Sequence, residues 1–179
     1  MKRLLLALFV VAGTLCLIPA TAIQVPTALN VGNQPLKAAS CASRDTLWIH
    51  HYVAALYVPP RDTPVAVLED PKKPKALLVQ ILSRSFLPRE MPKKWSATLE
   101  RELDRAQLER VRAAWRGLSV GDRVMLAYAP GRGVTLELNE RTVVRSAEHR
   151  LVNALLETWA DGQPVATKVG TTVDKHPCP

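Results

Sequence analysis

The pattern of apolar and polar positions predicts several strands, grouped in clusters along the chain. Runs of β-branched, aromatic and aliphatic residues alternate with turn residues, such as Gly32-Asn33-Gln34, Pro59-Pro60 and Pro130-Gly131-Arg132-Gly133. The predicted extended segments, in chain order, are a lead-in at 23–30, a short hairpin around 31–36, a long strand at 46–58, a central strand at 75–85, and strands at 123–129, 134–139 and 142–146.

Between these clusters the apolar period changes to that of a helix. Residues 63–71 fit one or two helical turns stopped near Pro71, and residues 88–118 fit an amphipathic helical pair broken around Asp104 to Ala106. Ser146 is a candidate cap for a third helical segment, which we expect to end at Gly162. The apolar stripes of the two long segments are formed by Trp95, Leu99, Leu103, Leu108, Val111 and Trp115, and by Leu151, Leu155 and Trp159.

Strands linked by hairpins, with helices in separate blocks, predict an α+β fold with a mostly antiparallel sheet. The length suits one domain with its own core. From Val165 onward the tail is polar and irregular, and we expect it to be loosely ordered.

The N-terminus has the three parts of a secretory signal peptide. Lys2 and Arg3 form a basic region, residues 4–17 an apolar region, and Ala20-Thr21-Ala22 a small-residue cleavage site. The apolar run is short for a bilayer span. We therefore predict a signal peptide at 1–22, a single domain at 23–179, and a periplasmic or secreted mature protein.

The chain carries a formal net charge of +8. This surplus favours acidic ligands and peripheral contact with an anionic membrane, or it is simply a basic solvated surface. Nucleic acid is not expected as a partner, because no compact Lys/Arg run is interleaved with aromatic residues.

Two cysteines, Cys41 and Cys178, follow the predicted cleavage site. An oxidising compartment makes a disulfide between them plausible, and two separate thiols also fit the sequence. A catalytic thiol has no recognisable partner residue in the sequence.

The remaining chemistry-bearing residues give little support for an enzyme or a metal site. His50 and His51 are adjacent on a predicted strand, so they point to opposite faces and cannot readily chelate one ion. No nucleophile elbow and no phosphate-binding glycine loop is present. We predict no metal, no cofactor and no catalytic residue, and the sequence gives no oligomeric state.

Arg44 and Tyr52 stand beside the apolar segments and form a candidate ligand grip. Arginine offers a forked donor to a carboxylate, and tyrosine adds one hydroxyl donor. At the mouth of an apolar cleft the pair suits a ligand with an acidic head and an apolar tail. The alternative is that Arg44 lies on the surface and Tyr52 in the core.

One long block resembles the chalcone isomerase-like family, in its bacterial exported branch. The family pattern "VGGxxLxLNGAGVRxKxxxKVYxAGLYL" compares with "VGNQPLKAASCASRDTLWIHHYVAALYVP" in this chain. The two agree without a gap at Val31, Gly32, Leu36, Arg44, Tyr52, Ala54, Leu56 and Tyr57. Three further segments resemble the family in order, "SFLPREMPKKW", "VGDRVMLAYAPGRGVTLELN" and "ALLETWADGQPV", so that the resemblance covers about residues 29–166.

The resemblance implies an open-faced β-sandwich, in which an antiparallel sheet packs against a layer of helices with a cleft between them. Arg44 and Tyr52 match the family positions that hold a substrate or a fatty-acid carboxylate. The family's catalytic tyrosine falls at about Met91, the usual helix asparagine has no clear match, and the "NGAG" segment is Ala39-Ser40-Cys41-Ala42. These losses remove donors that would stabilise an enolate or phenolate.

The resemblance therefore implies an exported non-catalytic protein that binds a small apolar acid such as a fatty acid. Arg44 and Tyr52 would hold the head group, and Met91 would line the cleft. The alternatives are an isomerase or lyase acting on a phenolic or enone substrate, and an envelope interaction module without a ligand. A straight strand would separate Arg44 from Tyr52 by about 26 Å. The paired grip thus requires the chain to turn back between them.

Overall fold

The computed structural model describes residues 25–46, 49–83, 91 and 93–159. Seven strands form one antiparallel sheet in the order β1-β2-β3-β4-β5-β6-β7, so every strand pairs with its neighbour in sequence. The strands are β1 (Ala28–Val31), β2 (Gln34–Thr46), β3 (Ile49–Val58), β4 (Lys75–Ile81), β5 (Arg123–Ala129), β6 (Gly133–Leu138) and β7 (Arg141–Ser146). β1 also approaches β5, which shows how strongly the sheet curls.

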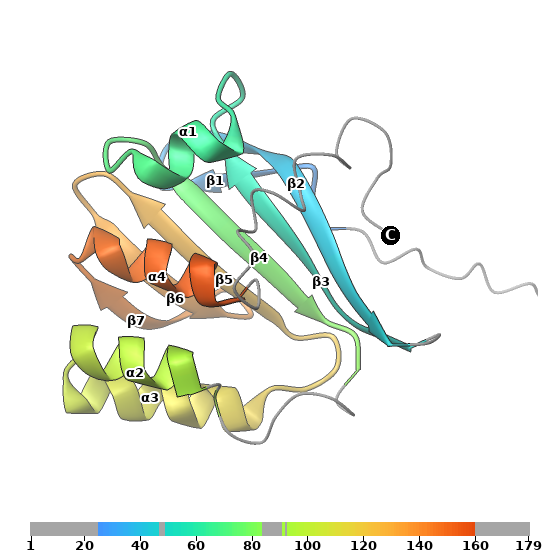
Figure 1. The fold of residues 1–179 in the computed structure, drawn as a ribbon, viewed down its shortest axis with the longest axis vertical. Helices are drawn as coiled ribbons and strands as arrows, with labels where there is room; N and C mark the ends of the chain where they lie inside the picture. The colour runs from blue at the N-terminus through green and yellow to red at the C-terminus, as the bar shows by residue number, and fades with distance from the viewer. Residues whose placement is uncertain (1–24, 47–48, 84–90, 92, 160–179) are drawn as a thin grey trace, which may run out of the picture.

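Four helices accompany the sheet (Figure 1): α1 (Pro64–Glu69), α2 (Lys93–Glu102), α3 (Arg105–Gly117) and α4 (His149–Trp159). α4 lies over β5 and β6, and α2 and α3 run side by side next to it (Figure 1). α2 ends at Glu102, and Asp104 caps the start of α3, because its side chain and that of Gln107 form a reciprocal capping box. The predicted break around Asp104 is therefore confirmed.

The helices cover one face of the sheet. The larger core cluster combines residues of α2, α3 and α4 with alternate residues of the strands, among them Leu56, Val79 and Leu126. The second cluster lies on the opposite face, and its members among the described residues come from strands or from the lead-in, among them Val53, Ala55 and Tyr57. An α+β fold with one helix-covered face is thus confirmed.

One predicted strand has the wrong boundaries. Residues 46–58 were expected to form a single strand, but β2 extends to Thr46 and β3 starts at Ile49, and the two pair antiparallel. β2 also takes up Ala39-Ser40-Cys41-Ala42, a stretch with weak β-propensity. Ser40, Cys41 and Ala42 pair with β3, which stabilises this stretch as a strand, whereas β1 pairs only with the preceding residues 34–37. The sequence pattern of β2 alone does not reveal this support.

The other predicted elements agree with the structure to within a few residues. Helix stripe residues Leu99, Leu103, Leu108 and Val111 are buried, as is Leu151 of α4. No described helix is long and apolar enough to span a bilayer. The predicted signal peptide at 1–22 and the tail from Val165 lie outside the described residues.

Candidate ligand-binding site

The hairpin of β2 and β3 brings the two candidate grip positions together. Arg44 and Tyr52 are direct partners in the antiparallel register, two pairs away from Thr46 and Ile49 at the hairpin end. Directly opposed residues share one face, with Cβ atoms about 5 Å apart. The turn-back that the paired grip requires is therefore present, although ligand binding by these residues stays a prediction.

Tyr52 and Met91 belong to the helix-covered side of the sheet. Both are partly buried and pack against the larger core cluster. Tyr52 alternates with Ala54 and Leu56 of the same cluster along β3, so the register places position 44 on this face as well. Tyr52 and Met91 thus border the same layer between sheet and helices, and position 44 lies opposite Tyr52 in the register.

The floor next to this pair is made of small residues. Ala42 faces Ala54 in the next same-side pair, and Ser40 faces Leu56 in the one after. Ser40 is fully buried, and its Oγ has no hydrogen-bond partner in the described part of the chain. An unpaired buried hydroxyl costs about 1–3 kcal/mol. The Ser40 hydroxyl is therefore a polar group among residues that are otherwise apolar, Ala42, Ala54 and Leu56.

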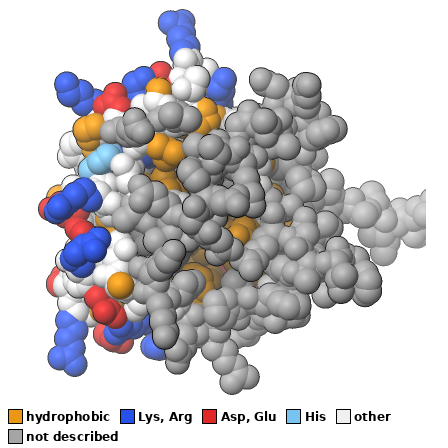
Figure 2. Space-filling model, viewed as in Figure 1, with side chains coloured by type: hydrophobic (Ala, Val, Ile, Leu, Met, Phe, Trp, Pro, Cys, Tyr) orange, Lys and Arg blue, Asp and Glu red, His pale blue; other side chains and the backbone are white. Residues whose placement is uncertain are grey.

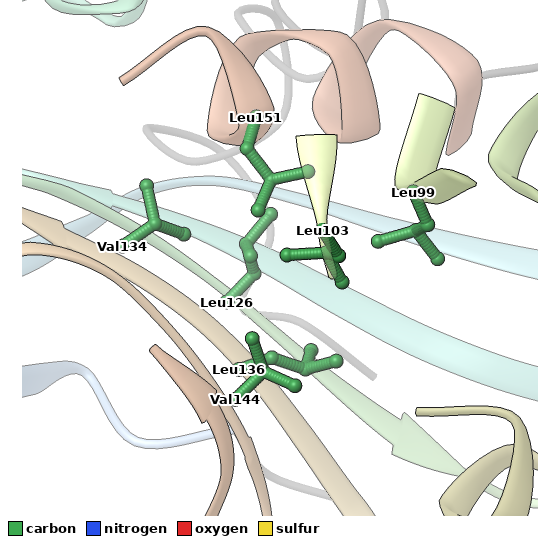
Figure 3. Close-up of a pocket in the computed structure, with 7 residues that line it drawn as sticks. All are labelled: Leu99, Leu103, Leu126, Val134, Leu136, Val144 and Leu151. Carbon is green, nitrogen blue, oxygen red and sulfur yellow. The ribbon is translucent and has the colours of Figure 1, made fainter. Parts of the chain in front are cut away.

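An apolar hollow lies farther along the same layer (Figure 3). Its walls are aliphatic and come from α2, from the residue after it, from β5, β6 and β7, and from α4: Leu99, Leu103, Leu126, Val134, Leu136, Val144 and Leu151. The space within it that a water molecule's centre can reach is about 10 Å³. That is room for about one water-sized sphere, far below the roughly 300–1,000 Å³ of a ligand pocket.

The hollow and the Arg44–Tyr52 pair are separate places in one layer. Strands pair about 4.8 Å apart, so β3 and β6 lie about 14 Å apart across the sheet. Core residues of β3, β4 and β5 connect the two places, including Leu56, Val79 and Leu126. A ligand tail that runs from the pair to the hollow would cross this packed region, and the helix layer would have to move to admit it.

A polar cluster at the start of β4 was missed by the sequence interpretation. Lys75 has no exposed surface, and burial lowers the pKa of its ammonium from 10.5 to about 8, against the opposing charge of Asp70. Its Nζ lies 3.1 Å from His149 Nε2 and donates to Leu68 O at 2.8 Å. The available signal was a lysine at the head of the apolar run "KALLVQI".

Cys41 is disulfide-bonded in the structure and packs against the second core cluster. The chain's other cysteines, Cys16 and Cys178, lie outside the described residues. The pairing of Cys41 with Cys178 therefore stays a prediction. Positions 41 and 44 are three steps apart along β2, so they fall on opposite faces of the strand.

The surface charges do not form one basic field on the face seen in Figure 2. Blue and red side chains alternate along the part of that face whose side chains are described. Arg112, for example, forms ion pairs with Glu100 at 2.6 Å and with Glu109 at 2.9 Å. Peripheral membrane contact stays a prediction. The side chains of His50 and His51 lie outside the described residues.

Comparisons with known proteins agree with this architecture. A family model described as chalcone isomerase-like matches residues 20–170. No curated protein sequence matches the chain. Among solved structures, the crystal structure of a fatty-acid binding protein from Arabidopsis thaliana superposes with a TM-score of 0.51. The superposition covers 82% of this chain and 88% of that chain at 10% sequence identity, so the likeness concerns the fold alone.

Proposed function

Because the chain belongs to the chalcone isomerase-like family, we propose that it is an exported, non-catalytic protein that binds a small apolar acid such as a fatty acid. The single observation that carries the proposal is the register of β2 and β3, in which position 44 is directly opposite Tyr52, a residue on the helix-covered side of the sheet. A carboxylate needs two or more donors within a few ångströms, and this pairing supplies them at neighbouring positions.

The arrangement assigns a role to each part of the ligand. The Arg44 guanidinium would pair with the carboxylate, and the Tyr52 hydroxyl would donate a further hydrogen bond. The tail would lie over the Ala42–Ala54 floor, with Met91 on its border. Apolar area removed from water contributes about 25 cal/mol per Å², so the tail would supply most of the affinity.

Two further observations support binding rather than catalysis. One solved structure with a similar fold is described as a fatty-acid binding protein. In the alignment by resemblance, the isomerases' catalytic tyrosine corresponds to Met91, and a thioether donates no hydrogen bond. An isomerase is therefore not proposed. Export rests on the signal-peptide pattern of residues 1–22.

Titration of the purified protein with a long-chain fatty acid tests the proposal. The wild type should bind, and Arg44→Ala should bind about tenfold to a hundredfold more weakly, since hydrogen bonds to charged groups contribute about 1.5–3 kcal/mol. Arg101→Ala is the matched control, because Arg101 is 67% exposed on α2 and pairs with the neighbouring Glu102. Wild-type protein without measurable binding, or equal affinity in Arg44→Ala, contradicts the proposal.

The small size of the hollow favours a second candidate, an envelope interaction module whose cleft is filled by its own side chains. The lining leucines and valines leave room for about one water molecule. Mass spectrometry of material that co-purifies with the protein separates the two candidates. A stoichiometric lipid or fatty acid supports the binding protein, and a lipid-free protein that also fails to bind in titration supports the module.

A further inference from the structure

Lys75 joins three separate elements through one buried ammonium group. Its Nζ donates to the carbonyl oxygens of Leu68 at 2.8 Å and Asp70 at 3.3 Å, at the C-terminal end of α1. On α4 the same atom lies 3.1 Å from His149 Nε2 and 3.5 Å from Asn153 Oδ1. His149 and Asn153 are four residues apart, so they share one face of α4. The ammonium thus ties α4 to α1 and to the first residue of β4.

The ammonium can donate to His149 only while that imidazole is neutral. An ammonium has three protons and no acceptor, so Nε2 must offer its lone pair and the proton must sit on Nδ1. Protonation of Nε2 would turn the contact between Lys75 and His149 into two donors and two positive charges about 3 Å apart. Repulsion would then replace the hydrogen bond.

The groups around His149 mostly oppose its protonation. Burial first, and then the Lys75 ammonium, lower the pKa of His149, and Asp70 acts in the opposite direction. From β5, the Tyr128 ring meets the imidazole edge-on at 4.6 Å, and its hydroxyl donates to Pro71 O. At the start of α4, Glu148 and Arg150 flank His149, are mostly exposed and face each other at 3.6 Å. His149 also lies in the first turn of α4, where the helix dipole disfavours a cation.

We propose that Lys75, His149 and Asn153 form an acid-released latch that holds α4 against the sheet. Above the pKa of His149 the latch is closed. Below it, protonation separates the first turn of α4 from Lys75. Leu151 follows His149 by two residues and forms one wall of the apolar hollow. Loosening of the first turn of α4 therefore opens the helix-covered layer from that side.

The latch itself does not depend on a ligand, but its role in ligand exchange rests on the proposed function. If an apolar acid binds in the layer, mild acid would speed its entry and exit by freeing α4. Protonation of the ligand's own carboxyl group occurs at lower pH, near 4 to 5. The two effects are thus separable along the pH axis.

Hydrogen exchange of the ligand-free protein between pH 8 and pH 5 tests the latch. After correction for the intrinsic pH dependence of exchange, protection of amides 151–159 should fall below about pH 6.5, by up to about tenfold per pH unit. Amides of β4 should keep their protection, because the latch opens locally. His149→Gln, whose side-chain oxygen still accepts from Lys75, should remove the pH dependence while leaving protection at pH 8 within about threefold.

Three outcomes overturn the latch. The first is constant α4 protection across the pH range in the wild type. The second is a parallel loss in α4 and β4, which indicates global unfolding. The third is an unchanged pH dependence in His149→Gln. Asn153→Asp serves as a second variant, because a carboxylate beside the imidazole stabilises the imidazolium in the closed latch and should make the loss of protection between pH 6.5 and pH 5 smaller. A loss of protection as large as in the wild type also contradicts the proposal. Because no fatty acid is used, failure of this test leaves the proposed function standing.

Discussion

Gly131 and Gly133 flank the turn between β5 and β6 and provide a matched pair of alanine substitutions. Both have positive φ angles, +75° and +79°. A Cβ atom at Gly131 would meet nothing within 4 Å, whereas one at Gly133 would collide with Ser146 O and lie 2.9 Å from Ala147 Cα. The two substitutions thus share the same backbone cost and differ in the collision.

The expected magnitudes follow from these two terms. An alanine at positive φ costs about 1–2 kcal/mol relative to glycine, so Gly131→Ala should lose about that much stability. Gly133→Ala carries the same cost plus about 1–3 kcal/mol for displacing backbone that belongs to β7 and to the approach to α4. At about 2–4 °C per kcal/mol for a domain of this size, its Tm should lie roughly 2–12 °C below that of Gly131→Ala.

Thermal and urea unfolding followed by circular dichroism measure both variants under one set of conditions. Coincident curves from circular dichroism and tryptophan fluorescence would support a two-state comparison. If the two variants lose equal stability, then β7 does not pass Gly133 as closely as described, and the placement of the approach to α4 is wrong. A larger loss in Gly131→Ala would contradict the reasoning altogether.

Three further measurements address buried polar groups. The folded-state pKa of Lys75, about 8, lies below its unfolded value of 10.5, so the unfolded chain binds more protons between these pH values. Stability should therefore rise from pH 8 to about 10, by up to about 1.4 kcal/mol per pH unit, and Lys75→Met should flatten this rise. Burial raises the pKa of Tyr57 to about 12, so the stability that its protonated hydroxyl contributes should be lost as pH rises above 10. Tyr57→Phe should remove this loss of stability at alkaline pH. The same substitution should cost about 1 kcal/mol at pH 7, because the Tyr57 hydroxyl donates to Pro26 O at 2.7 Å. Non-reducing peptide mapping should recover Cys41 linked to Cys178, and reduction should cost roughly 3–5 kcal/mol; a Cys41 peptide without Cys178 contradicts the pairing.

The sequence predicted most elements because their patterns are local. The apolar stripe from Leu99 to Val111 and the alternation in residues 134–139 each have one period and clear turn residues at their ends. The boundary between β2 and β3 was wrong because the stretch Ala39-Ser40-Cys41-Ala42 has weak β-propensity of its own and depends on pairing with β3. Pairing partners are not encoded in the propensity of the segment itself.

The candidate site likewise has some features that local sequence patterns reveal and others that depend on contacts between distant residues. Arg44 and Tyr52 were found from residue type and family resemblance, and only the register showed that they face each other. The cluster around Lys75 was not predicted, because Lys75 and His149 are 74 residues apart and no short motif joins them. The small volume of the hollow depends on side-chain packing among five elements, which no sequence period records.

Fatty-acid titration of the wild type and of Arg44→Ala, with Arg101→Ala as the control, tests the central claim most directly. The account predicts saturable binding by the wild type and by Arg101→Ala, with affinity lowered about tenfold to a hundredfold in Arg44→Ala. Binding that is absent in the wild type, or that is the same in all three proteins, would contradict a carboxylate grip at the β2–β3 hairpin.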